Sequence, residues 1–352
     1  MTPVIESDIS PTSLLTPAAT ERYAHRAWTV NDIASRRYRV FYDVTAAARE
    51  QIWEAVQGLR RRKIHLGIIE PEDFRVPAFG RDVPELRRRL DDECGFVVLR
   101  GLEVDRYTRD ENAMVYWGLA NYIGRVIRQN LRGERLDTVQ DRGDKVTDPY
   151  RLIETTRYFL PHTDNAMLEP RWPDYLGLLC LHSAQSGGEN LVISAYTLLR
   201  EISRSHPDFI ERLSQPWHID PPIEQRIPGG AATWSKPIFE VIRDELRIHY
   251  LRYYIDPGMR KAGCPMTAQE TQMLDFLDTL LERPEFAFSH KLEPGEILLN
   301  NNNWTLHGRK AFVDHEHPEH KRLLMRIWLW RRHVWPGTDP IDLDTADGVE
   351  GR

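Results

Sequence analysis

Residues 322–330 read Arg322-Leu-Leu-Met-Arg326-Ile-Trp-Leu-Trp330, and this stretch decides the fold class. The side chains of a β-strand point alternately to its two faces. One face would carry Leu323, Met325, Ile327 and Leu329, and the other Arg322, Leu324, Arg326, Trp328 and Trp330. Both faces are largely apolar, so we expect a strand that other layers of the protein cover on both sides.

The two arginines of this strand, Arg322 and Arg326, are therefore not expected on an ordinary solvated face. A buried guanidinium group needs an anionic partner, because leaving a charge unpaired away from water is costly. The partner could be an internal aspartate or glutamate. It could also be a bound dicarboxylate, which the planar guanidinium grips with two parallel hydrogen bonds. The strand alone leaves both possibilities open.

Apolar or alternating runs predict several strands after about residue 150, at 175–181, 190–194, 247–254 and 323–330. A single helix is expected among them, because Thr267-Ala-Gln-Glu270 has the form of a capping box and Pro284 ends the apolar pattern. The segment 218–236 is rich in proline and glycine and is predicted to be a mobile loop. This half of the chain is thus predicted to be mainly β.

The first part of the chain is predicted to be mainly helical, with helices at 45–62, 84–90 and 109–123 and a short strand at 94–101. No linker or internal repeat divides the 352 residues, so we expect one domain over 31–335. Its helical part would span 45–125 and its β core about 94–332. Residues 1–30 are expected to form a polar arm, and 336–352 a tail.

The composition disfavours several classes of protein. With 53 acidic and 47 basic residues the net charge is −6, which argues against a dedicated nucleic-acid binder. No run approaches about 18 apolar residues, so no membrane span is expected. The three cysteines, Cys94, Cys180 and Cys264, form no CxxC motif, which favours a reducing, cytoplasmic setting. A small-molecule partner is expected, and homo-oligomerisation stays open.

A histidine and an aspartate lie two residues apart in Phe159-Leu-Pro-His162-Thr163-Asp164. On an extended chain both side chains point to the same side and can bind one metal ion. A second histidine would complete a facial triad, which leaves three positions of an octahedral Fe(II) open. Short H-x-D strings also arise by chance, so the pair is a weak signal when taken alone.

His307 is the candidate for the second histidine, in Asn302-Asn-Trp-Thr-Leu-His307-Gly308-Arg309. It lies at the end of an apolar strand that runs into an asparagine cluster. The alternative is a surface-loop histidine beside a glycine. A richer histidine tract, His315-Glu-His317-Pro-Glu-His320, is interpreted as a charged surface loop.

Taken together, these motifs resemble the taurine dioxygenase-like (TauD/TfdA) family of Fe(II)- and 2-oxoglutarate-dependent dioxygenases, related to the clavaminate-synthase-like enzymes. The resemblance covers about residues 94–332. The motifs that carry it are Gly95-Phe-Val-Val-Leu-Arg-Gly101, His162-Thr-Asp164, Asp174-Tyr-Leu-Gly-Leu-Leu, Ser186-Gly-Gly-Glu-Asn190, Pro294-Gly-Glu, Asn302-Asn-Trp-Thr-Leu-His307-Gly-Arg and the strand with Arg322 and Arg326. It implies a mainly β fold with flanking helices, a distorted jelly roll or double-stranded β-helix.

The resemblance also implies roles for individual residues. His162, Asp164 and His307 would bind Fe(II), and Arg322 would pair with the distal carboxylate of 2-oxoglutarate. Asn190 stands where the family often has a threonine or another residue that hydrogen-bonds this carboxylate. An amide can still donate there.

The substrate end of the site is assigned by the same resemblance. Arg326 matches an arginine that in many members reaches either the anionic group of the substrate or the inner end of the cosubstrate. Near positions that line the pocket in relatives are Gln129, Asn130, Tyr158 and Asn165. The alternative for this set is local hydrogen bonding within loops.

The implied activity is oxidation of an unactivated C–H bond, with O2 and 2-oxoglutarate consumed and succinate and CO2 released. Hydroxylation of a small anionic or zwitterionic molecule, such as an amino acid or a natural-product intermediate, is expected, with desaturation as the alternative outcome. Halogenation is disfavoured, because family halogenases lack the carboxylate that Asp164 supplies. A non-catalytic jelly-roll binding protein is disfavoured, because all three implied ligands and Arg322 are present together. A zinc hydrolase with the same ligand set would leave Arg322 without a function.

Overall fold

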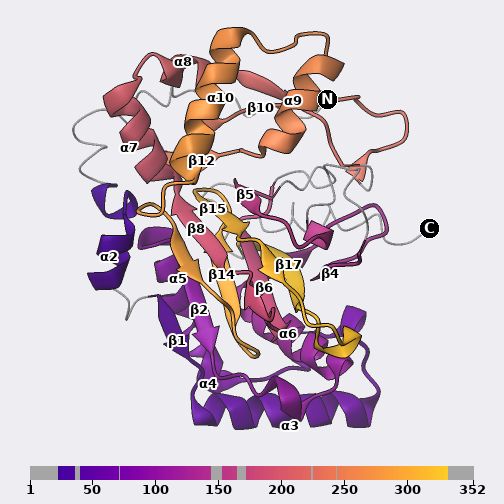
Figure 1. Ribbon diagram of the computed structural model, residues 1–352. Coiled ribbons are helices and arrows are strands. Elements are labelled where there is room, and N and C mark those ends of the chain that lie inside the picture. The colour runs from indigo at the N-terminus through magenta and orange to yellow at the C-terminus, as the bar shows by residue number, and fades with distance from the viewer. Residues whose placement is uncertain are drawn as a thin grey trace.

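The computed structural model describes residues 23–35, 40–70, 72–143, 153–164, 172–222, 225–242 and 244–331. Two β-sheets form its centre, with helices packed outside each of them (Figure 1). This architecture confirms the predicted jelly roll with flanking helices. Most of the expected polar arm and all of the expected tail lie outside the described residues.

The larger sheet has seven strands. Its order is β1 (Phe41–Asp43), β2 (Phe96–Arg100), β14 (Ile297–Asn301), β6 (Tyr175–His182), β17 (Leu323–Arg331) and β3 (Gly124–Ile127), with β4 (Leu136–Val139) also paired to β17. All of these pairs are antiparallel except β1 with β2.

The smaller sheet has four strands, in the order β13 (Phe288–His290), β8 (Asn190–Ser194), β15 (Thr305–Arg309) and β5 (Phe159–His162). Apolar side chains from both sheets meet in a common buried cluster that includes Leu178 of β6, Val192 of β8 and Trp328 of β17. The two sheets therefore pack face to face. Three short two-stranded pairs complete the β structure, namely β7 (Ser186–Gly187) with β16 (Phe312–Val313), β9 (Pro216–Ile219) with β10 (Trp234–Pro237), and β11 (Phe239–Ile242) with β12 (Glu245–Ile248).

Strand β17 is covered on both sides, as its alternation predicts. Leu323, Met325, Ile327 and Leu329 belong to the buried cluster shared with the N-terminal helices. Leu324, Trp328 and Trp330 belong to the cluster between the sheets. The helices on this outer face are α3 (Ala46–Arg62), α4 (Pro77–Gly80), α5 (Val83–Asp92) and α6 (Arg109–Ile123).

The smaller sheet is covered on its outer side by a second group of helices (Figure 1). These are α7 (Ala195–Ser205), α8 (Phe209–Leu213), α9 (Arg252–Lys261) and α10 (Ala268–Leu281). The capping box at the start of α10 is present, as predicted. Shorter helical elements are η2 (Ala24–Arg26), α2 (Val30–Ser35), η4 (Leu66–Ile68), η5 (Val104–Arg106) and η8 (Pro318–His320).

The expectation of a single helix in this half was wrong, because α7, α8 and α9 join α10 in the described chain. The expected strand 247–254 ends at Ile248, and α9 begins at Arg252. The helix was not predicted because its aromatic residues favour a strand and the internal Pro257 disfavours a helix. The helix is stabilised instead by burial of Ile255 and Met259, which lie one turn apart.

The expected loop 218–236 is shorter than predicted, because its two ends belong to β9 and β10. No helix of the described residues has the length and apolar character needed to span a membrane.

Candidate metal centre

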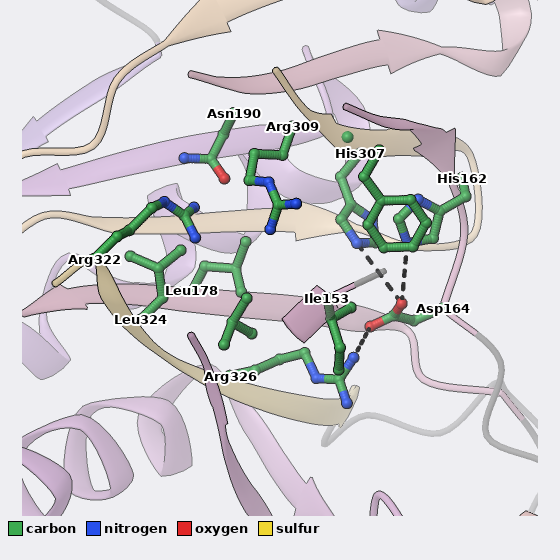
Figure 2. Close-up of a pocket in the computed structure, with 13 residues that line it drawn as sticks. Ile153, His162, Asp164, Leu178, Asn190, His307, Arg309, Arg322, Leu324 and Arg326 are labelled. Atoms are coloured by element: carbon green, nitrogen blue, oxygen red, sulfur yellow. Dashed lines mark hydrogen bonds and ion pairs between the residues drawn. The ribbon is translucent and has the colours of Figure 1, made fainter. Parts of the chain in front are cut away.

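Two histidines meet across neighbouring strands of the smaller sheet. His307 of β15 lies directly opposite His162 of β5, and their ring centroids are 4.4 Å apart. Asp164 follows β5 by two residues and turns its carboxylate towards both rings, with Oδ1 3.5 Å from Nε2 of His162 and 3.7 Å from Nε2 of His307. The structure thus brings the three predicted metal ligands together, all of them buried (Figure 2).

The main chain at Asp164 is fixed by a residue from a distant part of the sequence. The Asp164 N–H donates to Oδ1 of Asn302 at 2.8 Å, and Nδ2 of Asn302 donates to the Asp164 carbonyl oxygen at 2.9 Å. Two bonds to one amide side chain hold the backbone in a single orientation. The asparagine cluster that precedes His307 therefore sets the position of the carboxylate.

The Asp164 side chain is held as firmly as its backbone. Its Oδ2 accepts a hydrogen bond from Nε1 of Trp328 at 2.7 Å and another from Nη1 of Arg326 at 3.3 Å. Because both donors bind the same oxygen, Oδ1 remains directed at the two imidazoles. Burial alone would raise the pKa of Asp164, but Arg326 and the histidines hold it well below its usual range.

Both histidines present Nε2 to this centre. Nδ1 of His162 lies 2.8 Å from the Leu160 carbonyl oxygen, which favours the tautomer with the proton on Nδ1. Phe159 stacks on the same ring at a centroid distance of 4.0 Å. Burial, with the neighbouring His162, lowers the pKa of His307 to about 3, so its imidazole is neutral and able to bind a metal.

This donor set fits a mononuclear Fe(II) ion. Two imidazole nitrogens and one carboxylate oxygen are available, and these ligand atoms all lie within 4.8 Å of one another. Ligands bonded at about 2.1 Å and at right angles would lie about 3 Å apart, and Oδ1 of Asp164 lies 3.5 and 3.7 Å from the two Nε2 atoms. The arrangement is that of the facial triad of non-haem iron oxygenases. Within the described residues it is the one group of this kind.

A pocket extends from the three ligands into the space between the sheets (Figure 2). Its far end is polar, with Asn190 and Arg322, and its walls are largely apolar. Nη1 of Arg322 and Nδ2 of Asn190 are both buried without a hydrogen-bond partner among the described residues. Buried donors without partners are rare and costly in proteins, so this end of the pocket suits a ligand that accepts hydrogen bonds.

Arg322 also lacks a charged partner. The ion pairs of the described residues do not include it, although its side chain is buried against Phe312. Burial lowers its pKa to about 10, a shift that the neighbouring Asp314 opposes. Internal pairing, which was one of the two possibilities for this arginine, is thus not observed. An anionic ligand would supply the missing charge.

Arg326 is placed differently. Its guanidinium lines the pocket and contacts Asp164, Asp137 at 3.4 Å and Oε1 of Gln129 at 2.7 Å. Gln129 in turn donates from Nε2 to the carbonyl oxygens of Arg135 and Arg326. For this second arginine internal pairing is therefore present. Gln129 contacts Arg326 but does not line the pocket.

The remaining predicted substrate residues lie away from the pocket lining. Asn130 is buried within its own loop, where it bonds Arg132 and Glu134. Tyr158 is partly buried against the cluster outside the smaller sheet, and burial raises its pKa to about 12. Asn165 lies outside the described residues.

Three residues of this site were not singled out from the sequence: Asn302, Arg309 and Trp328. Arg309 could have been found, because it follows His307 by two residues on a strand and must share its face. The partners of Asn302 and Trp328 could not, since both contacts join residues more than a hundred positions apart.

The chain is similar to known dioxygenases over most of its length. The family model described as "Taurine catabolism dioxygenase TauD, TfdA family" matches residues 60–328. FR-33289 synthase of Streptomyces rubellomurinus is 26% identical over 82% of this chain and 84% of its own. A taurine hydroxylase-like protein of Stachybotrys chartarum is 28% identical over 74% of this chain and 67% of its own.

Solved structures share the fold. Asparagine oxygenase, in complex with Fe(II), 3-hydroxyasparagine and succinate, superposes with a TM-score of 0.64 at 19% identity over 82% of this chain and 93% of its own. The non-haem iron oxygenase OrfP, in complex with iron and alpha-ketoglutaric acid, gives a TM-score of 0.58 at 18% identity, with the same coverage of 82% and 93%. As its motifs predict, the chain belongs to the TauD/TfdA family of Fe(II)- and 2-oxoglutarate-dependent dioxygenases.

Proposed function

We propose that His162, Asp164 and His307 bind Fe(II) and that the protein uses 2-oxoglutarate and O2 to hydroxylate a small anionic or zwitterionic substrate. The observation that carries this proposal is the buried Arg322, which has no ion-pair partner among the described residues and lies in the same pocket as the triad. A non-catalytic binding protein with a vestigial site would not be expected to retain an unpaired buried guanidinium, because such a charge destabilises the fold.

In this proposal each part of the chain has a separate task. The bound iron and cosubstrate supply the oxidising chemistry. Asn302 and Trp328 hold Asp164 so that one oxygen faces the metal position. Arg322 and Asn190 bind the distal carboxylate of 2-oxoglutarate, and the apolar walls of the pocket keep water away.

The proposal is tested by the conversion of 2-oxoglutarate to succinate. Purified protein reconstituted with Fe(II) should form succinate only when O2 is present, and Zn(II) in place of Fe(II) should give none. Screening amino acids and sulfonates for stimulated succinate release would identify the substrate class. Hydrolysis supported by Zn(II), or no O2-dependent succinate with any compound, would reject the assignment.

The relatives point to amino acids and other small acids as substrates. The solved neighbours hold hydroxyasparagine or hydroxylated arginine, and another relative is a glutarate 2-hydroxylase of Klebsiella pneumoniae. Such substrates carry a carboxylate. We assign its binding to Arg326, which lines the pocket and which Gln129 holds in place.

Replacing Arg326 with alanine is expected to uncouple the reaction. Without its anchor the substrate is misaligned, so 2-oxoglutarate should still bind and be slowly consumed while product falls at least tenfold. Product and succinate are measured together, with bound iron determined because Arg326 also contacts Asp164. Arg132→Ala removes an exposed arginine and is the matched control. Loss of the visible Fe(II)–2-oxoglutarate charge-transfer band without substrate would instead place Arg326 in the cosubstrate site.

A further inference from the structure

A third arginine, Arg309, lies in the cosubstrate end of the pocket. It follows His307 by two residues on β15, so both side chains point from the same face of the strand into the space between the sheets. Its position in the ladder is directly opposite Asn190 of β8. Side chains of directly opposite residues lie about 5 Å apart at Cβ. Arg309 is thereby a neighbour of a residue already assigned to the distal carboxylate.

The spacing along β15 fits one ligand that reaches from the metal position to this arginine. A strand rises about 3.4 Å per residue, so Arg309 lies about 7 Å beyond His307. Figure 2 shows its guanidinium pointing into the pocket between His307 and Arg322. The far end of a five-carbon 2-oxo diacid held at the metal therefore falls among Arg309, Arg322 and Asn190.

The guanidinium of Arg309 is oriented by the main chain. Its Nη2 donates to the carbonyl oxygens of Thr155 at 2.7 Å and Arg157 at 2.8 Å. These bonds fix the plane of the group. Arg309 and Arg322 thus line the same end of the pocket.

We propose that Arg309 is a second cosubstrate arginine, which shares the distal carboxylate of 2-oxoglutarate with Arg322 and makes the pocket selective for 2-oxo diacids. This inference rests on the proposed function. The competing interpretation is that Arg309 only ties residues 155–157 to β15 and leaves ligand selection to Arg322. The two interpretations predict different effects of substituting Arg309. The first predicts weaker binding only of a ligand with a distal carboxylate, and the second predicts the same effect on ligands with and without that carboxylate.

The test compares two ligands of equal carbon length, 2-oxoglutarate and 2-oxovalerate, which lacks the distal carboxylate. Their dissociation constants are measured by calorimetry on protein loaded with Mn(II), which accepts the same ligands but supports no turnover. Arg309→Gln should raise the dissociation constant of 2-oxoglutarate at least tenfold and change that of 2-oxovalerate less than threefold. Arg309→Lys, which keeps the charge but not the fork, should lie in between. Lys310→Gln removes the exposed positive charge next along the chain and should match the wild type.

Each outcome has one meaning. Equal weakening of both ligands by Arg309→Gln, or no weakening, overturns the inference and leaves Arg309 as a residue that holds the pocket wall. Should Arg309→Gln fail to fold, as judged by thermal unfolding, Arg309→Lys decides by the same ratio. Arg322→Ala is run in the same series. If the wild type itself binds 2-oxoglutarate no better than 2-oxovalerate, the proposed cosubstrate fails and the Arg309 inference with it.

Discussion

Replacing His307 with alanine is expected to lower turnover by more than about 100-fold and to abolish stable Fe(II) binding. Changing a residue that only hydrogen-bonds a metal ligand already lowers metal affinity or activity by about 10–100-fold, and loss of a ligand itself should have a larger effect. The same result is expected for Asp164→Ala and His162→Ala, since each removes one of the three proposed ligands. Iron content after reconstitution and the rate of succinate formation measure the two effects. Full activity in any of these variants would remove the triad assignment.

The fold should survive the His307→Ala substitution. The imidazole of His307 forms no hydrogen bond from Nδ1 within the described chain, so its removal leaves no donor or acceptor newly unpaired. Thermal unfolding of the metal-free variant should therefore stay near that of the wild type. His315→Ala is the matched control, because this histidine lies in the loop that leads to β17 and belongs to no metal-binding group in the described residues. It should be nearly silent in both assays.

Replacing Arg322 with alanine is expected to weaken 2-oxoglutarate binding by roughly 2–5 kcal/mol, the range for truncating one member of a buried charge pair. That corresponds to about a 30-fold or larger rise in the apparent KM for 2-oxoglutarate. Arg322→Lys should recover only part of the loss, because an ammonium group cannot make two parallel hydrogen bonds to one carboxylate.

Stability separates a ligand-binding arginine from a structural one. Arg322 is buried and has no ion-pair partner among the described residues, so an apolar side chain of similar length should fit there at no loss of stability. We therefore expect ligand-free Arg322→Met to be as stable as the wild type or more stable. Arg331→Met is the contrasting variant, because this arginine, the last residue of β17, pairs with Asp91 at 2.9 Å. The Arg331→Met variant should be less stable than the wild type, because it leaves Asp91 without this ion pair. A destabilised Arg322→Met with unchanged 2-oxoglutarate dependence would contradict the cosubstrate role.

The sequence predicted those features that short-range pattern controls. The alternation of 323–330 was enough to expect a strand covered on both faces, and the buried clusters on its two sides confirm it. The H-x-D pair and His307 were named from residue types and spacing, and the structure brings their side chains within 4.8 Å of one another. The capping box of α10 was also predicted from the sequence and is confirmed.

Features that depend on tertiary packing could not be predicted. Helix α9 contains a proline and two tyrosines, and its stability comes from apolar residues that other elements bury. Arg322, which immediately precedes β17, and Arg326 within it both lie among apolar residues in the sequence, yet Arg326 contacts Asp137 and Asp164 while Arg322 contacts neither. Asp137 lies opposite Arg326 on the paired strand β4, and this pairing cannot be predicted from the local sequence.

The side-chain amide of Asn302, which accepts from the N–H of Asp164 and donates to its carbonyl oxygen, has a consequence for the newly made chain. These contacts join residues separated by 138 positions. While residues beyond about 300 are still inside the ribosome, the emerging polypeptide has His162 and Asp164 but neither Asn302 nor His307. A site made of these residues can therefore form only after the last of them has left the ribosome. Iron held by all three proposed ligands would then be acquired only by a chain that has completed this part of its synthesis.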